Sequence, residues 1–252
     1  AEEDDLPRAQ SALLERDEGN WLPVLYGLTA MFGDDPDDLD RVDIWDNGAS
    51  RYYRVVDYKT GKKDFDYCDV FNGVGLQMLL YMFALKSSGS DMLGDRPVAA
   101  GVQYFPARAP YLTSDGKLTA EEAEQERISK WKRKGLLLND EDVLQAMEPG
   151  DTPVYLPYQN KKGELTGSLA TREQFRLLED FVSGSLRELT QKLFSGTVSP
   201  NPIVRGPMVS SCQYCEYQHA CHKDACKPDV RYMKKVGADE FWKELERRKA
   251  NG

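Results

Sequence analysis

The sequence predicts an α/β fold: a mixed central sheet flanked by helices, with a C-terminal cysteine-rich metal-binding appendage. Three observations predict it. Short β-branched runs alternate with longer helical patterns along the chain. An Asp-Asn-Gly turn signal at 46–48 joins two of the expected strands. Four of the five cysteines crowd together near the C-terminus, which is typical of metal ligation.

The composition is that of a soluble globular protein. The chain has 252 residues, of which 40% are hydrophobic and 30% charged, and its net charge is −9. An acidic balance disfavours nucleic-acid binding by the protein as a whole, although a local basic strip can still bind phosphates. The N-terminal residues do not resemble a signal peptide, and the longest apolar run, 74–85, is shorter than the roughly 20 residues of a membrane span. We therefore expect a cytoplasmic protein with reduced thiols.

The first elements are expected in the order helix, strand, strand. The expected segments are a partial helix at 7–16, an apolar run at 21–32, an acidic loop at 33–38, a strand at 39–45 and its return strand at 51–59. The alternation of the strand at 39–45 places Asp40, Val42 and Ile44 on one face.

The later elements follow the same reasoning. They are a buried helix at 73–85, a strand at 98–105, a charged helix from Thr119 that Gly135 ends, a second helix at 139–148, a hairpin at 154–168 and a long helix to about Gly196, begun by the capping box Thr171 and Gln174. We expect one domain over 1–205, with a helical and hairpin excursion at 112–170, and a cysteine-rich segment with a tail over 206–252.

A carboxylate and an amine end the second strand of the expected hairpin. Because strand side chains alternate, Asp57 and Lys59 share a face. If Asn47 pairs with Ser50 across the turn, Asp40 lies directly opposite Asp57.

Two adjacent carboxylates repel each other unless a cation neutralises them, and Mg²⁺ prefers oxygen ligands. We therefore expect Asp40 and Asp57 to bind one or two Mg²⁺ (or Mn²⁺) ions, with Lys59 helping to orient a water or to stabilise charge on a phosphodiester. The alternative is a solvated strand edge, on which Asp40 forms a salt bridge with Arg41 or Arg54.

One polar residue interrupts the apolar helix that follows. Gln77 lies one helical turn before Tyr81, on the same face, so that together they could contact DNA or a metal-bound water. A core helix with one hydrogen-bonded glutamine explains the pattern equally well.

The cysteine spacing predicts a metal site. Cys212, Cys215 and Cys221 suit an iron–sulfur cluster or a tetrahedral zinc ion. Cys226 or His222 could complete a zinc site. The alternative is a set of thiols in an irregular tail.

Two basic segments are candidate DNA contacts. Lys62 and Lys63 follow Lys59, and Lys130 and Lys132 flank Trp131 in a second cluster. A solvated helix face accounts for the second cluster as well.

These motifs together resemble a known family. "LDRVDIW", "VVDYKTGKK" and "GLQMLLY" are similar to the RecB-like branch of the PD-(D/E)xK nucleases, in that family's order. Over roughly residues 20 to 225 the chain also resembles the C-terminal region of the AddB-type subunit of bacterial ATP-dependent helicase–deoxyribonucleases. The resemblance implies a restriction-endonuclease-like fold, and a nuclease domain that is part of a longer protein.

The resemblance also implies residue roles, cofactors and partners. The implied roles are Asp40 and Asp57 as metal ligands, the Tyr58 carbonyl as a third ligand, Lys59 as catalytic lysine, and Gln77 with Tyr81 as an accessory pair. The family holds a [4Fe–4S] cluster on three cysteines matching Cys212, Cys215 and Cys221, plus an upstream cysteine that is missing here.

The implied activity is Mg²⁺-dependent exonuclease cleavage of single-stranded DNA, on the 5′-terminated strand, during double-strand-break repair. The implied partners are single- and double-stranded DNA and the helicase–nuclease subunit that completes the heterodimer, with no membrane contact. The alternatives are a non-catalytic DNA-guiding or subunit-docking module and a CRISPR-associated RecB-like exonuclease.

Overall fold

The structure, a computed structural model, describes two compact units. The described residues are 22–24, 41–88, 93–94, 96–107, 112, 116–150, 152–199, 201–206, 209–221 and 230–251, with the backbone alone at 22–24, 88, 209, 214 and 251. Unit 1 comprises the described residues up to Phe65 and those of Gln77–Arg176, and unit 2 those of Asp66–Leu76 and Leu177–Gly252. The boundary predicted between 205 and 206 falls inside unit 2. The division into a nuclease domain before it and a cysteine-rich metal-binding segment after it stays a prediction.

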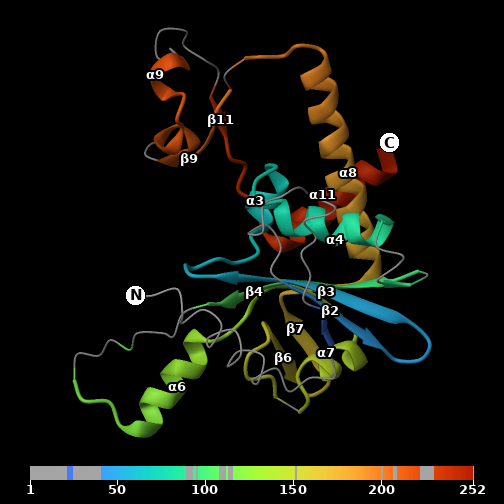
Figure 1. Ribbon diagram of the computed structural model, residues 1–252, viewed down its shortest axis with the longest axis vertical. Coiled ribbons are helices and arrows are strands. Elements are labelled where there is room, and N and C mark those ends of the chain that lie inside the picture. Colours follow the sequence, from blue (N-terminus) through green and yellow to red (C-terminus); the bar gives the residue numbers. More distant parts are fainter. Residues whose placement is uncertain are drawn as a thin grey trace. The chain divides into compact units, whose positions relative to one another are not determined.

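Unit 1 is built on a mixed six-stranded sheet (Figure 1). Its strands are β1 (Leu22–Val24), β2 (Arg41–Asp46), β3 (Arg51–Lys59), β4 (Val98–Pro106), β5 (Lys134–Leu138) and β8 (Leu169–Ala170). Their order is β1-β2-β3-β4-β5-β8. The β3–β4 and β5–β8 pairs are parallel and the other pairs are antiparallel, so the predicted mixed α/β class is confirmed.

The β2–β3 hairpin has the register on which the sequence argument depended. Asn47 donates its backbone N–H to the Ser50 carbonyl at 3.2 Å, and Gly48 takes a φ of 82° in the turn. The paired strands run from Asp46 opposite Arg51 to Arg41 opposite Val56. The predicted turn at 46–48 and return strand at 51–59 are therefore confirmed.

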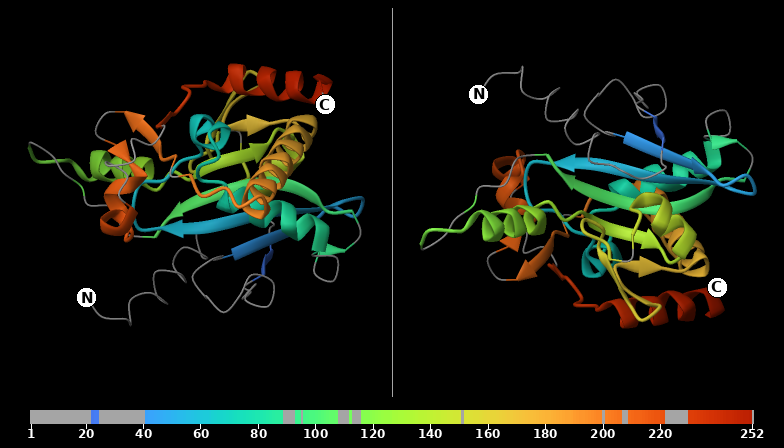
Figure 2. Two further views of the ribbon diagram at one scale, coloured as in Figure 1. Left: turned by 90° about the horizontal axis from the view of Figure 1, so that it is seen from above. Right: turned by 90° about the horizontal axis from the view of Figure 1, so that it is seen from below.

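Helices and a hairpin complete the described part of unit 1. They are α4 (Gln77–Ser88), α6 (Ala120–Lys130), α7 (Glu141–Met147) and the hairpin of β6 (Tyr158–Lys161) and β7 (Glu164–Gly167). Helix α4 lies on one face, and α7 with the β6–β7 hairpin lies on the other (Figure 1). Figure 2 shows these two faces in turn. Helix α6 has no buried residue.

Helix α4 begins later than the sequence pattern predicts. The expected helix was 73–85, whereas α4 spans Gln77–Ser88. Gly73 and Gly75 have φ values of 77° and 67°, in the left-handed region that glycine adopts without steric cost. These residues form a turn before the helix, which places Gln77 at its first position.

Gly135 does not end the helix that Thr119 caps. Helix α6 already ends at Lys130 with Trp131 as its C-cap, and Gly135 lies inside β5. Its φ is 139°, and a Cβ there would collide with the carbonyl oxygen of Val102 in β4. The glycine is required by the close approach of two strands, a tertiary contact that a local helix-stop rule does not detect.

The described part of unit 2 combines helices with a small sheet. Its elements are α3 (Tyr67–Phe71), most of α8 (Arg172–Phe194), β9 (Ile203–Gly206), β10 (Val209–Ser210), the 3₁₀ helix η2 (Ser211–Tyr214), α9 (Gln218–Cys221), β11 (Arg231–Tyr232) and α11 (Ala238–Asn251). The predicted capping box starts α8: Gln174 N–H donates to Thr171 Oγ1 at 3.2 Å, and Thr171 N–H donates to Gln174 Oε1 at 2.8 Å.

An aromatic cluster forms the core of unit 2. Phe241 of α11 is fully buried. Its ring centroid lies 4.9 Å from Trp242, 5.2 Å from Tyr67, 6.2 Å from Phe181 and 6.4 Å from Phe71. Most of these pairs meet at steep or edge-to-face angles, the geometry that aromatic quadrupoles favour. The cluster joins α11 to α3 and α8.

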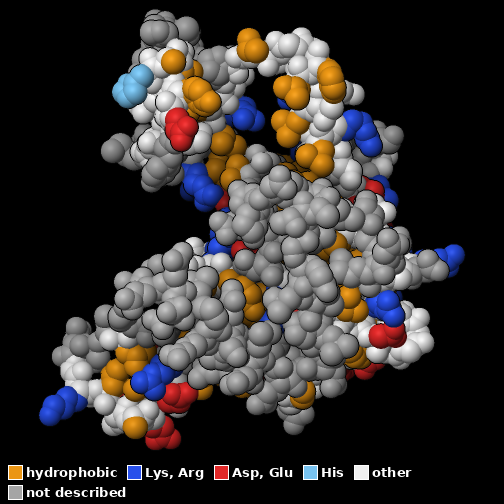
Figure 3. All heavy atoms as spheres, in the orientation of Figure 1, with side chains coloured by type: hydrophobic (Ala, Val, Ile, Leu, Met, Phe, Trp, Pro, Cys, Tyr) orange, Lys and Arg blue, Asp and Glu red, His pale blue; other side chains and the backbone are white. Residues whose placement is uncertain are grey.

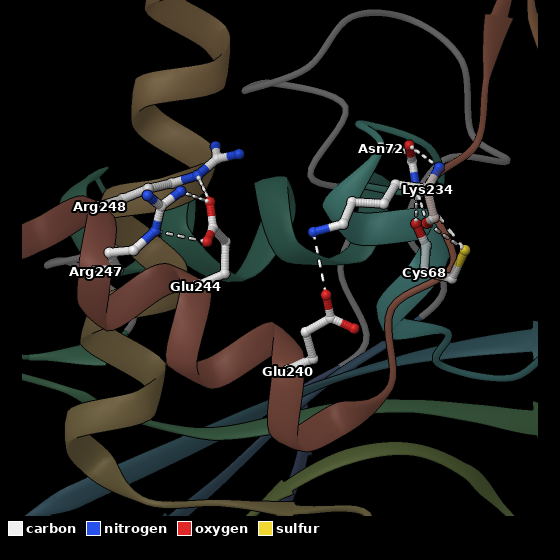
Figure 4. Close-up of polar contacts among 7 residues, drawn as sticks. All are labelled: Cys68, Asn72, Lys234, Glu240, Glu244, Arg247 and Arg248. Atoms are coloured by element: carbon white, nitrogen blue, oxygen red, sulfur yellow. Dashed lines mark hydrogen bonds and ion pairs between the residues drawn. The ribbon is translucent and has the colours of Figure 1, made fainter.

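Polar contacts hold the segment before α11 against α3 (Figure 4). The Asn72 amide donates to the Lys234 carbonyl at 2.9 Å and accepts from the Lys234 N–H at 3.0 Å. Cys68 is half-buried with its Sγ 3.2 Å from the same carbonyl. Lys234 also pairs with Glu240 at 3.1 Å.

The apolar stripe of α8 continues beyond its buried part. Val182 is buried, but Leu186, Leu189 and Leu193 on the same helical face are 41%, 57% and 75% exposed. Apolar side chains are visible on this part of α8 in Figure 3. Among the described helices, no segment is both long enough and apolar enough to cross a bilayer.

Phe241→Ala is expected to lower the free energy of unfolding by about 3–5 kcal/mol, because it removes a fully buried ring from the aromatic cluster. Urea unfolding followed by circular dichroism measures the loss. Phe194→Ala is the matched control, since that ring is 86% exposed, and should change the value by less than about 0.5 kcal/mol. Equal losses in the two variants would contradict the core described here.

The pKa of Glu244 is expected to be about 2, lowered from 4.5 chiefly by the hydrogen bonds from Arg247 at 2.8 and 2.9 Å. The contribution of this pair to stability is therefore complete above pH 4.5 and is lost as the pH falls towards 2. Carboxyl-carbon NMR titration measures the value. Arg247→Gln should return the pKa towards 4.5, whereas Lys243→Gln, which removes a neighbouring charge but no bond to Glu244, should leave it low.

Candidate functional site

The predicted carboxylate–lysine pair forms at the end of β3. Asp57 and Lys59 lie on the same face of the strand, and Lys59 Nζ is 2.7 Å from Asp57 Oδ2. The Asp57 side chain is 13% exposed and that of Lys59 is 37% exposed. The carboxylate is thus largely shielded from water, whereas the ammonium remains accessible to a ligand.

Helix α4 covers this face of the sheet. Tyr53, two alternations before Asp57, donates its hydroxyl to the Met82 carbonyl of α4 at 2.7 Å. Helix α4 runs opposite to β3, so its first turn lies towards the end of β3 that carries Asp57 and Lys59 (Figure 1). We call this face of β2, β3 and β4 the site face.

The first turn of α4 carries the predicted glutamine–tyrosine pair. Gln77 Nε2 donates to the Tyr81 hydroxyl at 2.9 Å. Gln77, which falls within the helix expected to be buried, is exposed, and Tyr81 is the buried partner. The reason is the later helix start, which leaves Gln77 at the helix end rather than within the packed part.

The first acidic residue of the motif, Asp40, lies outside the described residues. The described register ends one residue after it, with Arg41 opposite Val56. The meeting of Asp40 with Asp57 therefore stays a prediction.

The opposite face of the same strands carries a buried ionic network that the sequence analysis did not anticipate. Asp43 accepts hydrogen bonds from Arg41 Nε at 2.6 Å and Nη2 at 2.7 Å, and from Arg54 Nε at 2.7 Å. All three residues are at most 1% exposed. We call this the reverse face. The available signal was the pair of charged residues at alternate positions 41 and 43 of one expected strand. Their pairing with Arg54 on the neighbouring strand could be identified only from the register.

The network extends to the residue between Asp57 and Lys59. Arg41 Nη1 donates to the Tyr58 hydroxyl at 2.9 Å. The Phe105 ring packs edge-to-face on Tyr58 at 5.7 Å, and the Arg41 and Arg133 guanidinium carbons lie 5.3 and 4.3 Å from its centroid.

The predicted DNA-contacting lysines lie on the surface of unit 1. Lys62, Lys63 and Lys132 are exposed, and Lys130 pairs with Glu126 at 2.8 Å. Lys134 Nζ is 3.4 Å from Asp64 Oδ2, which ties the segment after β3 to the start of β5. The two basic clusters therefore lie on segments that meet at this ion pair.

The cysteine segment folds into tight turns. Cys215 N–H donates to the Cys212 carbonyl at 3.3 Å, and Cys221 N–H donates to the Tyr217 carbonyl at 2.9 Å. Within the part of the chain that the structure describes, no three His, Cys, Asp or Glu side chains gather into a metal-binding group. The three predicted ligands are thus near one another in sequence but do not form a metal site as placed, and Cys226 and His222 lie outside the described residues.

The donor atoms at the end of β3 suit a hard divalent ion. Carboxylate and backbone carbonyl oxygens are the ligands that Mg²⁺ prefers, and Asp57 with the Tyr58 carbonyl supplies both types in adjacent residues. Among the described residues Asp57 forms its ion pair through Oδ2. The chemistry of these residues therefore fits Mg²⁺.

Comparison with known proteins gives one family. Residues 38–222 match the PD-(D/E)XK nuclease superfamily. This stretch includes Asp57, Lys59, Gln77 and Tyr81, and ends at His222 within the cysteine cluster.

Several curated relatives share one description, the B-type subunit of an ATP-dependent helicase/deoxyribonuclease. The chain is 34% identical over 216 residues to that of Clostridium perfringens, covering 82% of this chain and 19% of the relative. It is 35% identical over 213 residues to that of Acetivibrio thermocellus, covering 81% and 18%, and 32% identical over 217 residues to that of Thermoanaerobacter sp., covering 83% and 19%. The chain therefore spans about a fifth of the length of these relatives.

Proposed function

This chain belongs to the PD-(D/E)XK nuclease superfamily, and on that basis we propose that it is the Mg²⁺-dependent deoxyribonuclease module of a bacterial helicase–nuclease complex. It acts as an exonuclease on single-stranded DNA, on the 5′-terminated strand, in the cytoplasmic repair of double-strand breaks by recombination. The observation that carries the proposal is the Asp57–Lys59 pair, on the strand face that α4 covers with Gln77 and Tyr81.

The register supports the missing half of the metal site. The described β2–β3 pairs follow one regular antiparallel register, from Asp46 opposite Arg51 to Arg41 opposite Val56. If that register continues by one residue, Asp40 lies opposite Asp57. Asp40, Asp57 and the Tyr58 carbonyl would then hold the ion. When bound, Mg²⁺ neutralises the carboxylates, polarises the phosphodiester and lowers the pKa of a bound water.

The side chains of the chain itself bind and orient the substrate. The Lys59 ammonium, held at 2.7 Å by Asp57, is exposed enough to meet a phosphate oxygen and stabilises the negative charge that develops there. The Gln77–Tyr81 hydrogen bond fixes the orientation of an exposed amide, which positions the DNA backbone or an attacking water.

Basic surface segments supply the approach for the DNA strand. Lys62 and Lys63 follow the catalytic strand directly, and Lys130 with Lys132 lies on the segment joined to it by the Asp64–Lys134 pair. These lysines contact phosphates, so binding weakens as salt increases.

The description of the relatives supports the assembly. Each is described as one lettered subunit of a helicase/deoxyribonuclease, which supports a heterodimer with a second helicase–nuclease subunit and favours this assignment over the CRISPR-associated exonuclease class. A non-catalytic DNA-guiding or docking role is the outcome if the intact protein does not cleave DNA.

The cysteine segment is proposed to hold a [4Fe–4S] cluster, with zinc as the alternative metal. The support is the spacing of Cys212, Cys215 and Cys221, whose turns keep them within one short stretch. The fourth ligand would come from Cys226, from His222 or from polypeptide beyond this chain.

Asp57→Asn and Lys59→Met are expected to lower Mg²⁺-dependent cleavage of end-labelled single-stranded DNA by about a hundredfold or more, the loss typical of removing a preorganised charge-stabilising group. Chelation with EDTA should abolish cleavage. Asp46→Asn is the matched control, because Asp46 pairs with Arg51 at 3.2 Å at the other end of the same hairpin, and it should cleave at the wild-type rate. Unchanged cleavage by a folded Asp57→Asn variant would refute the nuclease assignment.

Protein purified without oxygen is expected to show a broad thiolate-to-iron absorption in the visible range and bound iron by elemental analysis. Cys215→Ser should abolish the absorption, whereas Cys68→Ser, outside the cysteine segment, should retain it. A colourless protein with one equivalent of zinc identifies the alternative metal, and protein without either metal contradicts the metal-site proposal.

A further inference from the structure

We propose that Asp43 and Tyr58 are positioning residues: together with Arg41 they form a lock on the reverse face of the sheet that holds the metal-binding and catalytic side chains in place on the site face. The proposal rests on the proposed function for the identity of the site. It assigns a role to Asp43, which has no access to a substrate because it is fully buried on the reverse face, and to the hydroxyl of the half-buried Tyr58.

The chain connectivity links the lock to the site. Arg41 directly follows Asp40 on β2, and Tyr58 lies between Asp57 and Lys59 on β3. In an extended strand, neighbouring side chains point to opposite faces, so that fixing one fixes the backbone direction of the next. The Arg41–Tyr58 hydrogen bond of 2.9 Å therefore joins the two strands at the residues adjacent to all three proposed site side chains.

Asp43 makes this join rigid. Its two oxygens take three hydrogen bonds of 2.6–2.7 Å, two from Arg41 and one from Arg54 on the neighbouring strand. A guanidinium held in two-point contact with a carboxylate has a defined plane, and that plane aims Nη1 of Arg41 at Tyr58. A neutral or shorter side chain at position 43 would leave Arg41 able to turn.

Burial prevents the network from exchanging its bonds for bonds with water. Arg41 is 1% exposed, and Asp43 and Arg54 are 0% exposed. A buried ion pair adds little net stability, but it can specify one strand register. We therefore expect the network to affect the geometry of the site more than the stability of the fold. A catalytic group displaced by about 1 Å can lose up to about a hundredfold in rate.

The decisive variant is Tyr58→Phe, which removes one hydroxyl and keeps the ring against Phe105. The matched control is Tyr52→Phe on the same strand and the same face: its hydroxyl also accepts from an arginine, Arg172 Nη2 at 2.7 Å, but residue 52 lies about 16 Å from Asp57 by strand rise. Each variant loses one arginine–tyrosine bond. Asp43→Asn is a second test of the lock.

Two measurements are made on each folded protein: Mn²⁺ affinity by isothermal titration calorimetry, and kcat and KM for single-stranded DNA. Tyr58→Phe is expected to weaken Mn²⁺ binding and to lower kcat, each by about tenfold, with KM for DNA unchanged within about twofold. Tyr52→Phe is expected to match wild type in both. Asp43→Asn, if it folds, should exceed the Tyr58→Phe losses.

Wild-type Mn²⁺ affinity in Tyr58→Phe, or equal losses in Tyr58→Phe and Tyr52→Phe, would overturn the proposal. So would a wild-type protein that binds no Mn²⁺, since there would be no site to position. A wild-type protein that binds Mn²⁺ without cleaving DNA refutes the proposed nuclease function instead, and the Mn²⁺ affinities of the two tyrosine variants then still decide whether the lock exists.

Discussion

The register of β2 against β3 is the constraint on which the candidate site depends. A slip of β3 by one residue would transfer Asp57 and Lys59 to the face of Arg41 and Asp43 and bring Arg54 under α4. The Asp43 carboxylate opposes such a slip, because its buried bond to Arg54 on the neighbouring strand forms only in the observed pairing, whereas Arg41 lies on its own strand. Separating these charges without water would cost about 3–5 kcal/mol. The electrostatics of one sheet face thus specify the geometry of the other.

Because strand side chains alternate, the two faces of the β2–β3 hairpin carry different sets of contacts. On the site face, Tyr53 anchors α4 through the Met82 carbonyl, and this places the Gln77–Tyr81 pair over the carboxyl end of β3. On the reverse face, the guanidinium groups of Arg41, Arg54 and Arg133 form cation–π contacts with the Phe105 ring. The candidate site thus lies on a strand whose other side is packed against a buried ionic network, an arrangement that holds side chains rigidly.

Local signals in the sequence were sufficient for several elements. The Asp-Asn-Gly turn, the Thr171–Gln174 capping box and the alternation at 51–59 predicted the hairpin, the start of α8 and the facing of Asp57 and Lys59, since each depends on residues within a few positions of one another. A prediction that needed a distant partner failed: Gly135 was taken as a helix stop although it serves a close strand contact. The predicted helix start at 73 was wrong for a local reason, because Gly73 and Gly75 adopt left-handed backbone conformations and delay the helix to Gln77.

What the sequence by itself determined was the chemistry available: an acidic and a basic group two residues apart, a glutamine one turn before a tyrosine, and thiols at ligand spacing. The tertiary structure decided which of these groups meet. It brought the lysine to the carboxylate and the glutamine to the tyrosine, and it joined Arg41, Asp43 and Arg54 in a network that no local pattern specifies. The physical reason is that alternation and helical period act along the chain, whereas burial and charge pairing act between segments that only the packed sheet brings together.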